Sequence, residues 1–381
     1  MPVRHLSIRI LALVGLCLAH PAAAAAQSAP VISPEYADMV KAYAAGDHVA
    51  ALAMLRAWPE GRVRQHNEGL KDAVVSIRKC PGCPTRLAFT KFPVRAALLL
   101  HADLETQQQL NPPESEQIPV CGSGPQAIAV EHLASILLLI DPDAGAFVKR
   151  AFLGMSGQAM WSHCFGEAAG WARSGLRHFP KDPSLLLADG VAHEARSFFT
   201  MAPAPPVMGL TPASIRKRDA LKAELVDLRE KARQSFEEAL QADPSLVEAR
   251  LRLGRVLWRL GRPVPARAAL EEVLARPAEA PQQYLSHLFL GRILEEREEI
   301  AAAEEHYRVA LAMQPLSEIA AVAVSHARFL QGDVEGARTQ LKAGLEAAMA
   351  RRDFDPWMMY LLPQTPGGEA IMDELRQSIT R

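Results

Sequence analysis

Three similar stretches of sequence follow one another in the second half of the chain. They read LRLGRVLWRLGRPVPARAALEEV (251–273), LFLGRILEEREEIAAAEEHYRVA (288–310) and VAVSHARFLQGDVEGARTQLKAG (322–344). Gly291 follows Gly254 by 37 residues, and Ser325 follows Gly291 by 34. A nearly constant period of this length, with small residues at matching places, indicates stacked helical hairpins. We expect the two helices of a hairpin to cross where Gly254 meets Ala266 and Gly291 meets Ala303.

The Leu-Gly spacing of these stretches resembles the tetratricopeptide repeat. The resemblance implies an all-α fold, a right-handed α-solenoid of helix-turn-helix repeats. It also implies a concave groove, lined by the first helix of each hairpin, that holds an extended peptide. Alignment on the Leu-Gly pairs carries that groove onto Arg252, Arg255, Trp258, Arg259, Leu288, Arg292, Glu295, Val322, His326 and Phe329.

The predicted groove is rich in arginine. Arg252, Arg255 and Arg259 share one helix face, and Arg292 holds the repeat position of Arg255. Guanidinium groups beside the Trp258 indole suit carboxylates, and therefore acidic or aromatic peptides. The alternative is a solvated arginine face that pairs with acids such as Glu271 and Glu272.

The first 26 residues have the pattern of a secretory signal. Arg4 and Arg9 precede an apolar run over 10–19, and an alanine triplet ends at Ala26. The apolar run is shorter than the roughly 20 residues that span a bilayer, so we expect export with cleavage after Ala26 and no stable membrane anchor. The expected location is periplasmic or extracellular, as for an exported bacterial protein.

Composition narrows the class of protein. Removing 1–26 removes two arginines and no acids, which takes the formal charge from −1 to −3. A near-neutral chain argues against a nucleic-acid-binding function. A hydrophobic content of 49% with few aromatic residues fits helix packed on helix.

We divide the chain into five segments. Prolines, including the Asp-Pro pairs at 182–183 and 243–244, indicate the boundaries between segments. We interpret 182–242 as one repeat with an extended hairpin loop. The predicted segments are a signal peptide (1–26), an irregular helical-hairpin region (27–199), a proline-rich insertion loop (200–216), tetratricopeptide-like repeats (217–348) and a C-terminal segment that caps the solenoid (349–381).

Four cysteines remain after the predicted cleavage. An even number in an exported chain indicates disulfides, and four cysteines allow three pairings. The simplest pairing joins Cys80 to Cys83 and Cys121 to Cys164. A redox pair at Cys80 and Cys83 lacks the βαβ surroundings of a thioredoxin-like site. A zinc site would need ligands whose spacing the sequence does not favour, so we expect no cofactor.

Enzyme signatures are incomplete. His193-Glu194 begins a zinc-protease motif, but Ser197 stands where its second histidine is needed. We therefore expect a non-catalytic scaffold that binds a protein or peptide, acidic ones included, in the groove. Two alternatives stay open. The first is an enzyme built around His132, His163, Cys164 and Glu167. The second is a solenoid that binds a small molecule or glycan through Trp161, Trp171 and Tyr43.

Overall fold

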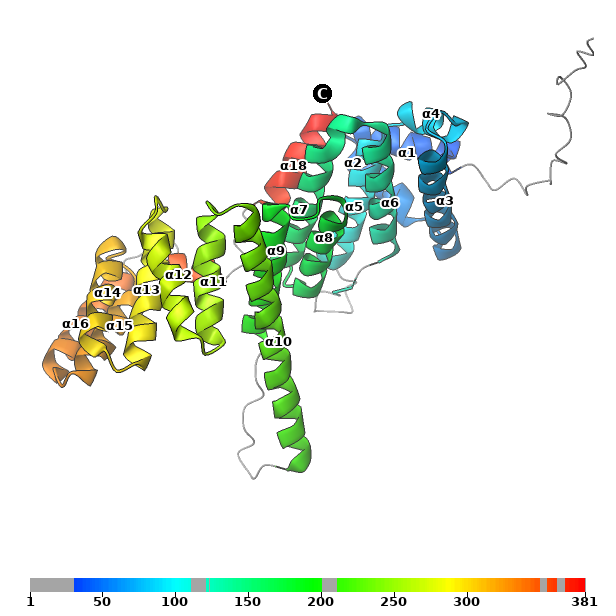
Figure 1. Cartoon of the computed structure of the whole chain (residues 1–381). Coiled ribbons are helices and arrows are strands. Elements are labelled where there is room, and N and C mark those ends of the chain that lie inside the picture. Colours follow the sequence, from blue (N-terminus) through cyan, green and yellow to red (C-terminus); the bar gives the residue numbers. More distant parts are fainter. Residues whose placement is uncertain are drawn as a thin grey trace, which may run out of the picture.

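The fold is an all-α solenoid of helical hairpins, as the sequence predicted (Figure 1). The computed structural model describes residues 31–110, 121–122, 124–200, 211–349, 355–361 and 367–380. All regular elements of these residues are helices. The predicted signal peptide (1–26) lies outside the described residues, as does most of the predicted insertion loop. None of the described helices combines the length and the apolar character needed to cross a membrane.

The N-terminal half is a series of antiparallel helices. Ser33 caps the first helix: its hydroxyl accepts a hydrogen bond from the Tyr36 backbone N at 3.2 Å, and Pro34 occupies the first turn. The helices are α1 (Pro34–Ala44), α2 (His48–Arg56), α3 (Glu60–Lys79), α4 (Pro84–Thr90), α5 (Val94–Leu110), α6 (Pro125–Ile140), α7 (Gly145–Trp161), α8 (Phe165–His178) and α9 (Pro183–Phe199), with the 3-10 helix η1 (Pro142–Ala144).

The C-terminal half holds the three similar stretches as regular hairpins. Its helices are α10 (Pro212–Ala242), α11 (Val247–Arg259), α12 (Pro263–Leu274), α13 (Ala280–Glu296), α14 (Ile300–Met313), α15 (Glu318–Leu330), α16 (Val334–Met349), α17 (Pro356–Leu361) and α18 (Gly368–Ile379). The predicted insertion loop (200–216) is therefore too long, because α10 begins at Pro212 with Thr211 as its cap. The first turns of α10 project well beyond the neighbouring helices (Figure 1).

Glycines set the close approach of the two helices in a hairpin. A Cβ added at Gly254 would lie 2.7 Å from Leu270 Cγ, and one added at Gly291 would overlap the Tyr307 ring. Gly190 of α9 faces Phe236 of α10 in the same way. The contacts fall one turn beyond the predicted partners Ala266 and Ala303, although the Ala266 backbone oxygen still lies 3.3 Å from the added Cβ at Gly254.

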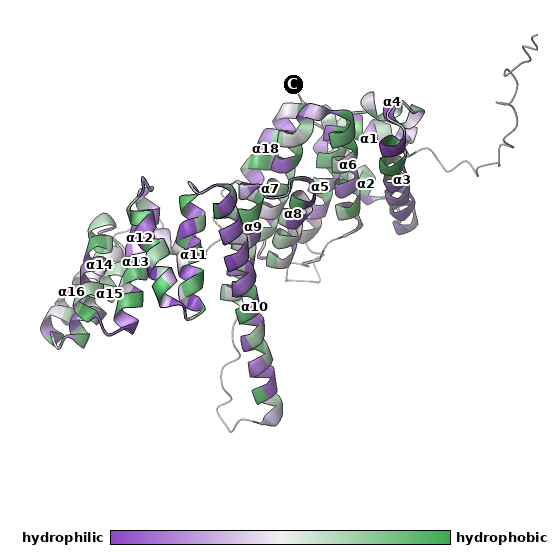
Figure 2. Ribbon diagram, in the orientation of Figure 1, coloured by the Kyte–Doolittle hydropathy of each residue, from purple (hydrophilic) through white to green (hydrophobic). Residues whose placement is uncertain are grey.

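The buried apolar residues form two large cores. Hydrophobic and hydrophilic residues alternate in stripes along the helices, so each helix has an apolar side that it buries against its neighbours (Figure 2). One core lies among α1–α9 and includes Tyr36, Phe152 and Trp171, whereas the other lies among α11–α15 and includes Tyr284 and Phe289.

The C-terminal tail runs back along the solenoid instead of covering its end. Tyr360 of α17 belongs to the core of α11–α15, and α17 packs on α13. Met372 of α18 belongs to the N-terminal core and lies on Gly154 of α7, beside which α18 is drawn in Figure 1. Arg376 of α18 also forms a bidentate pair with Asp103, with N–O distances of 2.7 and 2.9 Å. The prediction that 349–381 caps the last repeat is therefore wrong for α17 and α18.

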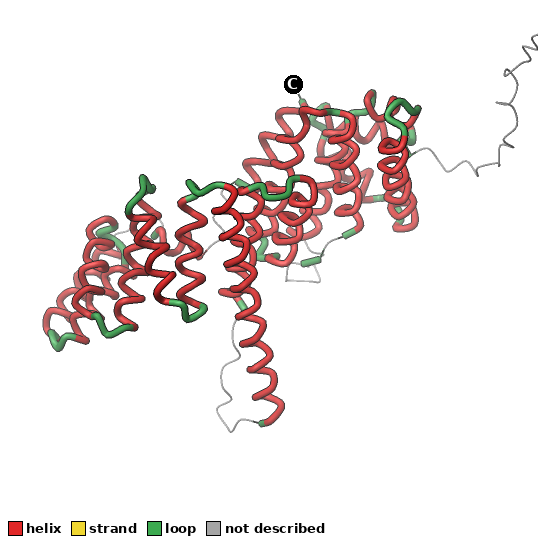
Figure 3. The backbone as a smooth tube through the Cα atoms, viewed as in Figure 1, coloured by secondary structure: helices red, strands yellow, loops and turns green. Residues whose placement is uncertain are grey.

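The reason is that the tail has buried partners elsewhere. Leucine at position 341 of α16, which matches Tyr307 of the preceding repeat, stays 37% exposed. The loops between successive helices alternate between the two edges of the stack (Figure 3). Trp357 of α17 lines a pocket on the stack, so the tail contributes to a surface of the repeats.

Candidate binding groove

A pocket of about 410 Å³ lies where the first helices of three successive hairpins meet. Its lining comes from α11, α13 and α15, with one residue each from α9 (Phe198), α14 (Tyr307) and α17 (Trp357). Among the predicted groove residues, those that line it are Arg255, Trp258, Arg259, Leu288, Arg292, Glu295, Val322 and His326. Sequence alignment on the repeats therefore brings together residues that lie up to 71 positions apart, from Arg255 to His326.

Arg252 and Phe329 do not line this pocket. Phe329 is 57% exposed at the end of α15, beyond the lining. Arg252 is only 5% exposed and lies beneath the ring of Tyr360, with its Cζ 4.5 Å from the ring centroid. The expectation that Arg252 is an exposed groove cation is wrong, because the chain itself supplies its partners.

Those partners centre on Glu194 of α9. Its two carboxylate oxygens lie 2.8 Å from Arg252 Nη1 and 2.8 Å from Arg255 Nη1, and the Tyr360 hydroxyl donates a further hydrogen bond. Glu194 is 3% exposed and Arg255 is 6% exposed. Burial alone would raise the pKa of Glu194, but the two guanidinium groups outweigh it and hold that pKa below its ordinary value.

Glu194 is a partner of the arginines that the sequence did not predict. In the sequence it stands out only as part of an incomplete zinc motif with His193. The repeat alignment could have predicted this contact. Gly190 aligns with Gly254 as the glycine where two helices cross, so Glu194 lies one turn further along the first helix of the preceding repeat. From that position Glu194 reaches Arg252 and Arg255 on the first helix of the next hairpin.

Two groove arginines keep hydrogen-bonding groups that the described residues do not use. The Arg255 Nε is buried and has no hydrogen-bond partner within the described part of the chain. Arg259 lies against Trp258, its Cζ 5.6 Å from the ring centroid, and none of the described acids forms an ion pair with it. Desolvation, followed by the neighbouring charge of Arg255, lowers the pKa of Arg259. Two cations therefore face the pocket with unused hydrogen-bonding capacity.

The opposite wall is internally paired. Glu295, 9% exposed, accepts a hydrogen bond from the Tyr307 hydroxyl at 3.1 Å and lies 3.3 Å from His326 Nδ1. Arg292 also contacts Glu295. Because these groups neutralise one another, they add shape to the wall but little net charge.

Aromatic rings form a continuous side of the pocket. The Phe289 ring lies 6.5 Å from that of Trp258 and 5.7 Å from that of Trp357, between ring centroids. The Trp258 Nε1 donates to Glu296 at 2.7 Å, which holds the indole in place. Flat rings beside the Arg259 guanidinium group make a surface that accepts both an apolar and an anionic group.

The residues of the glycan-binding alternative do not share a surface. Tyr43 is fully buried and hydrogen-bonds to Asp103, and Trp171 is only 5% exposed, whereas Trp161 is 65% exposed. Packing explains the difference, since Tyr43 and Trp171 belong to the N-terminal core. That hypothesis is therefore wrong as stated.

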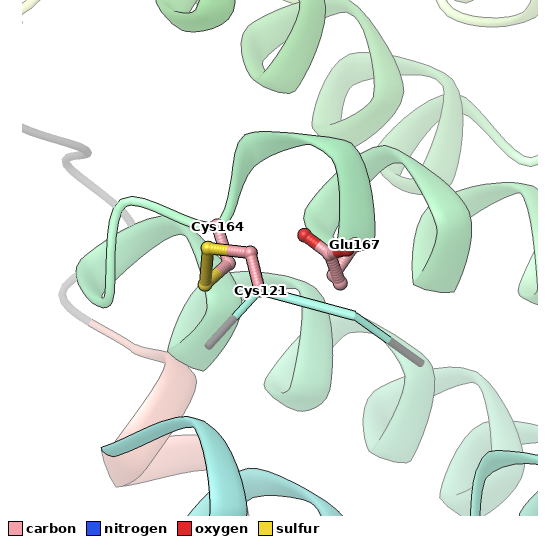
Figure 4. Close-up of side chains that lie close together, drawn as sticks. All are labelled: Cys121, Cys164 and Glu167. Atoms are coloured by element: carbon pink, nitrogen blue, oxygen red, sulfur yellow. A yellow bond between two sulfur atoms is a disulfide. The ribbon is translucent and has the colours of Figure 1, made fainter. Parts of the chain in front are cut away.

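Two residues of the enzyme alternative, Cys164 and Glu167, lie close together, but Cys164 belongs to a disulfide. Cys121 and Cys164 are bonded, as predicted, and the Glu167 carboxylate lies near the two sulfur atoms (Figure 4). A bonded sulfur is neither a nucleophile nor a thiolate ligand. The cluster therefore supports a structural reading of Cys164.

The second predicted disulfide is absent. Cys80 is exposed and Cys83 is partly exposed, and both are free thiols. They lie on either side of the turn between α3 and α4, where the Cys83 backbone N donates to the Cys80 carbonyl at 3.1 Å. The pair is close together but unbonded in this structure, so the prediction of a Cys80–Cys83 bond is not met.

One segment of the chain matches a known protein family. Residues 229–288, from the second half of α10 into α13, match the tetratricopeptide repeat. No curated relative matches the chain.

Among solved structures, MamA 41-end from Desulfovibrio magneticus RS-1 is 19% identical, with 55% of this chain and 98% of that chain covered at a TM-score of 0.40. PilW, a widely conserved type IV pilus biogenesis factor, is 19% identical, with coverages of 60% and 93% and a TM-score of 0.42. YrrB, a TPR protein with an unusual peptide-binding site, is 14% identical, with coverages of 58% and 95% and a TM-score of 0.37. These likenesses concern the helical fold alone. Residues 229–288 therefore form a tetratricopeptide-repeat segment, which lies within a longer stack of helical hairpins.

Proposed function

We propose that this protein is a non-catalytic scaffold of the bacterial cell envelope that holds a segment of a partner protein in the pocket on α11, α13 and α15. The observation that carries the proposal is the exposed guanidinium group of Arg259, which lines the pocket beside Trp258 and forms no ion pair with any acid of the described residues.

The pocket chemistry defines the segment. Arg255 and Arg259 call for a carboxylate, and the rings of Trp258, Phe289 and Trp357 call for an aromatic or aliphatic side chain next to it. A volume of about 410 Å³ is at the small end of the range for ligand pockets, which suits a few side chains of an extended segment. The ligand that we propose is therefore a short acidic segment with one bulky apolar residue.

The envelope location rests on two observations. Residues 1–26 have the order of a signal peptide, and the Cys121–Cys164 bond is of the kind that persists in oxidising compartments. Mass spectrometry of the protein purified from its native host tests the location: we expect a mature N-terminus at Gln27. A protein that keeps residues 1–26 in the cytoplasm would contradict export.

The binding experiment uses two synthetic peptides of the same length. One contains two aspartates that flank a tryptophan, and in the other lysine replaces each aspartate. We expect the mature protein to bind only the acidic peptide, with affinity that falls as salt rises, because the Debye length shrinks to about 8 Å at physiological ionic strength. Isothermal titration calorimetry measures both effects.

Matched variants locate the site. Arg259→Glu reverses the charge of an exposed groove residue and should abolish binding, whereas Arg308→Glu, on the second helix α14, should leave it unchanged. Binding that survives Arg259→Glu and is lost in Arg308→Glu would place the partner on the opposite face and would end the groove proposal.

A further inference from the structure

The CPGC sequence at residues 80–83 forms a solvent-exposed dithiol between two helices. Cys80 is the last residue before the turn that follows α3, and Cys83 immediately precedes α4. A hydrogen bond of 3.1 Å from the Cys83 backbone N to the Cys80 carbonyl closes the turn. The Cys83 sulfur also lies 3.7 Å from the Ser76 hydroxyl and 3.8 Å from the Ser76 carbonyl oxygen, which fixes its position.

From this geometry we propose that Cys80 and Cys83 are a reversible thiol–disulfide exchange site, which reacts with the disulfide of a protein or of a small thiol compound. The proposal is independent of the groove. It rests on two free, accessible thiols that one tight turn holds together.

The two thiols have different chemical characters. Hydrogen bonding from the Arg86 backbone N–H lowers the pKa of the Cys83 thiol, while desolvation and then the hydrogen bond with Cys83 raise the pKa of Cys80. The local sequence 78–86 contains two arginines and one lysine but no acid. Positive surroundings favour a thiolate and attract anionic thiol compounds.

The reaction balances without a further reagent. The Cys83 thiolate attacks one sulfur of the incoming disulfide, forms a mixed disulfide and releases the other sulfur as a thiolate. Cys80 then loses its proton to solvent and attacks the Cys83 sulfur, which releases the second thiolate. The protein dithiol has lost two electrons and two protons, and the incoming disulfide has become two thiols.

The other cysteine pair provides the contrast. Cys121 and Cys164 are 43 residues apart in sequence, and Cys164 is 1% exposed. A bond across a long loop removes much chain entropy from the unfolded state, whereas a bond across the two residues between Cys80 and Cys83 removes little. The first bond therefore stabilises the fold, and the second is free to open and close.

The test uses the full mature chain with oxidised and reduced glutathione, followed by alkylation and intact mass measurement. In the wild-type protein, oxidised glutathione should remove two thiols without leaving glutathione attached. Reduced glutathione should then restore both thiols, while the Cys121–Cys164 bond persists.

Two matched variants assign the roles. Cys80→Ser should retain one glutathione, on Cys83, and Cys83→Ser should react at least about tenfold more slowly at neutral pH, because it keeps only the thiol of raised pKa. Either of two outcomes would overturn the proposal. The first is a Cys80–Cys83 bond that resists reduced glutathione until the protein is denatured. The second is wild-type protein that accumulates glutathione instead of closing the bond.

Discussion

Glu194 and Arg255 form a buried ion pair between successive hairpins, with 2.8 Å between Glu194 Oε1 and Arg255 Nη1 and 61 residues between them in sequence. The same carboxylate pairs with Arg252. The arrangement ties α9 to α11, and Tyr360 of the returning tail covers it. Arg255 lines the groove, but the residues that hold it in place, Glu194 and Tyr360, do not line the groove.

Removal of the Glu194 charge should destabilise the fold strongly. Glu194→Gln removes the anion that pairs with Arg255 and one of the two that pair with Arg252, the other being Glu248. Loss of one partner of a buried pair costs about 3–5 kcal/mol. Urea denaturation should show this loss. The control is Glu224→Gln, which removes an exposed pair with Arg196 and should change stability by less than about 0.5 kcal/mol. Equal midpoints for the two variants would contradict the structural role of Glu194.

The same network changes the expected effect of arginine substitutions. Arg252→Glu should unfold or strongly destabilise the protein, because it places a second acid beside Glu194 within the buried site. Arg259→Glu should keep the native circular-dichroism spectrum, because Arg259 is exposed. A folded Arg252→Glu variant with an unchanged melting temperature would show that the buried pair is unimportant.

Stability should fall as the pH drops below about 6.5. Burial lowers the pKa of His66 to about 3 and that of His101 to about 4, so the folded state keeps both rings neutral while the unfolded state takes up protons below its ordinary pKa of 6.5. Each histidine should then cost about 2 kcal/mol between pH 6.5 and pH 5. Urea titrations at the two pH values measure the loss.

His66→Asn is the control for this pH dependence. It removes one of the two rings whose pKa burial lowers most, so the loss of stability between pH 6.5 and pH 5 should be about 2 kcal/mol smaller than in the parent protein. Burial also lowers the pKa of five other histidines, whose contributions both proteins share: His132, His178, His193, His287 and His306. Glu194 acts at lower pH: its lowered pKa stabilises the fold above the ordinary carboxyl pKa, and that contribution disappears as the pH falls toward the lowered value. An unchanged slope in His66→Asn would mean that His66 titrates normally.

The crossing glycines should not tolerate side chains. Gly291→Leu forces atoms into the Tyr307 ring, and Gly254→Leu forces them into Leu270, so each should cost about 1–3 kcal/mol or more. Gly170→Ala is the matched control, because a Cβ there meets nothing within 4 Å in helix α8. It should stabilise the protein by about 0.5–1 kcal/mol through the lower entropy of the unfolded chain. Thermal denaturation distinguishes the two classes.

One turn offers a stabilising substitution. Gly261 and Gly332 end the first helices of two hairpins with φ of 73° and 86°, and Glu298 occupies the matching position with φ of 63°. A side chain in this left-handed region costs about 1–2 kcal/mol, so Glu298→Gly should raise stability by up to that amount. The opposite change, Gly261→Ala, should lower it. A destabilised Glu298→Gly variant would show that the Glu298 side chain makes compensating contacts.

The sequence by itself determined the repeat architecture. Each hairpin needs a small residue where its two helices cross, and this need recurs with every repeat. The spacing from Gly254 to Gly291 in the sequence follows from it. The same alignment grouped Arg255, Trp258, Arg259 and His326, because equivalent positions of stacked hairpins must lie side by side.

Only the tertiary structure decided which of these residues are buried by other parts of the chain and which remain open to a ligand. Burial of Arg252 depends on Glu194, 58 residues earlier, and on Tyr360, far beyond the repeats. Two contacts of α18 position the C-terminal tail. Met372 packs on Gly154, and Arg376 pairs with the buried Asp103. Such contacts follow no period, because they depend on the shape and charge of surfaces that exist only once the solenoid has formed.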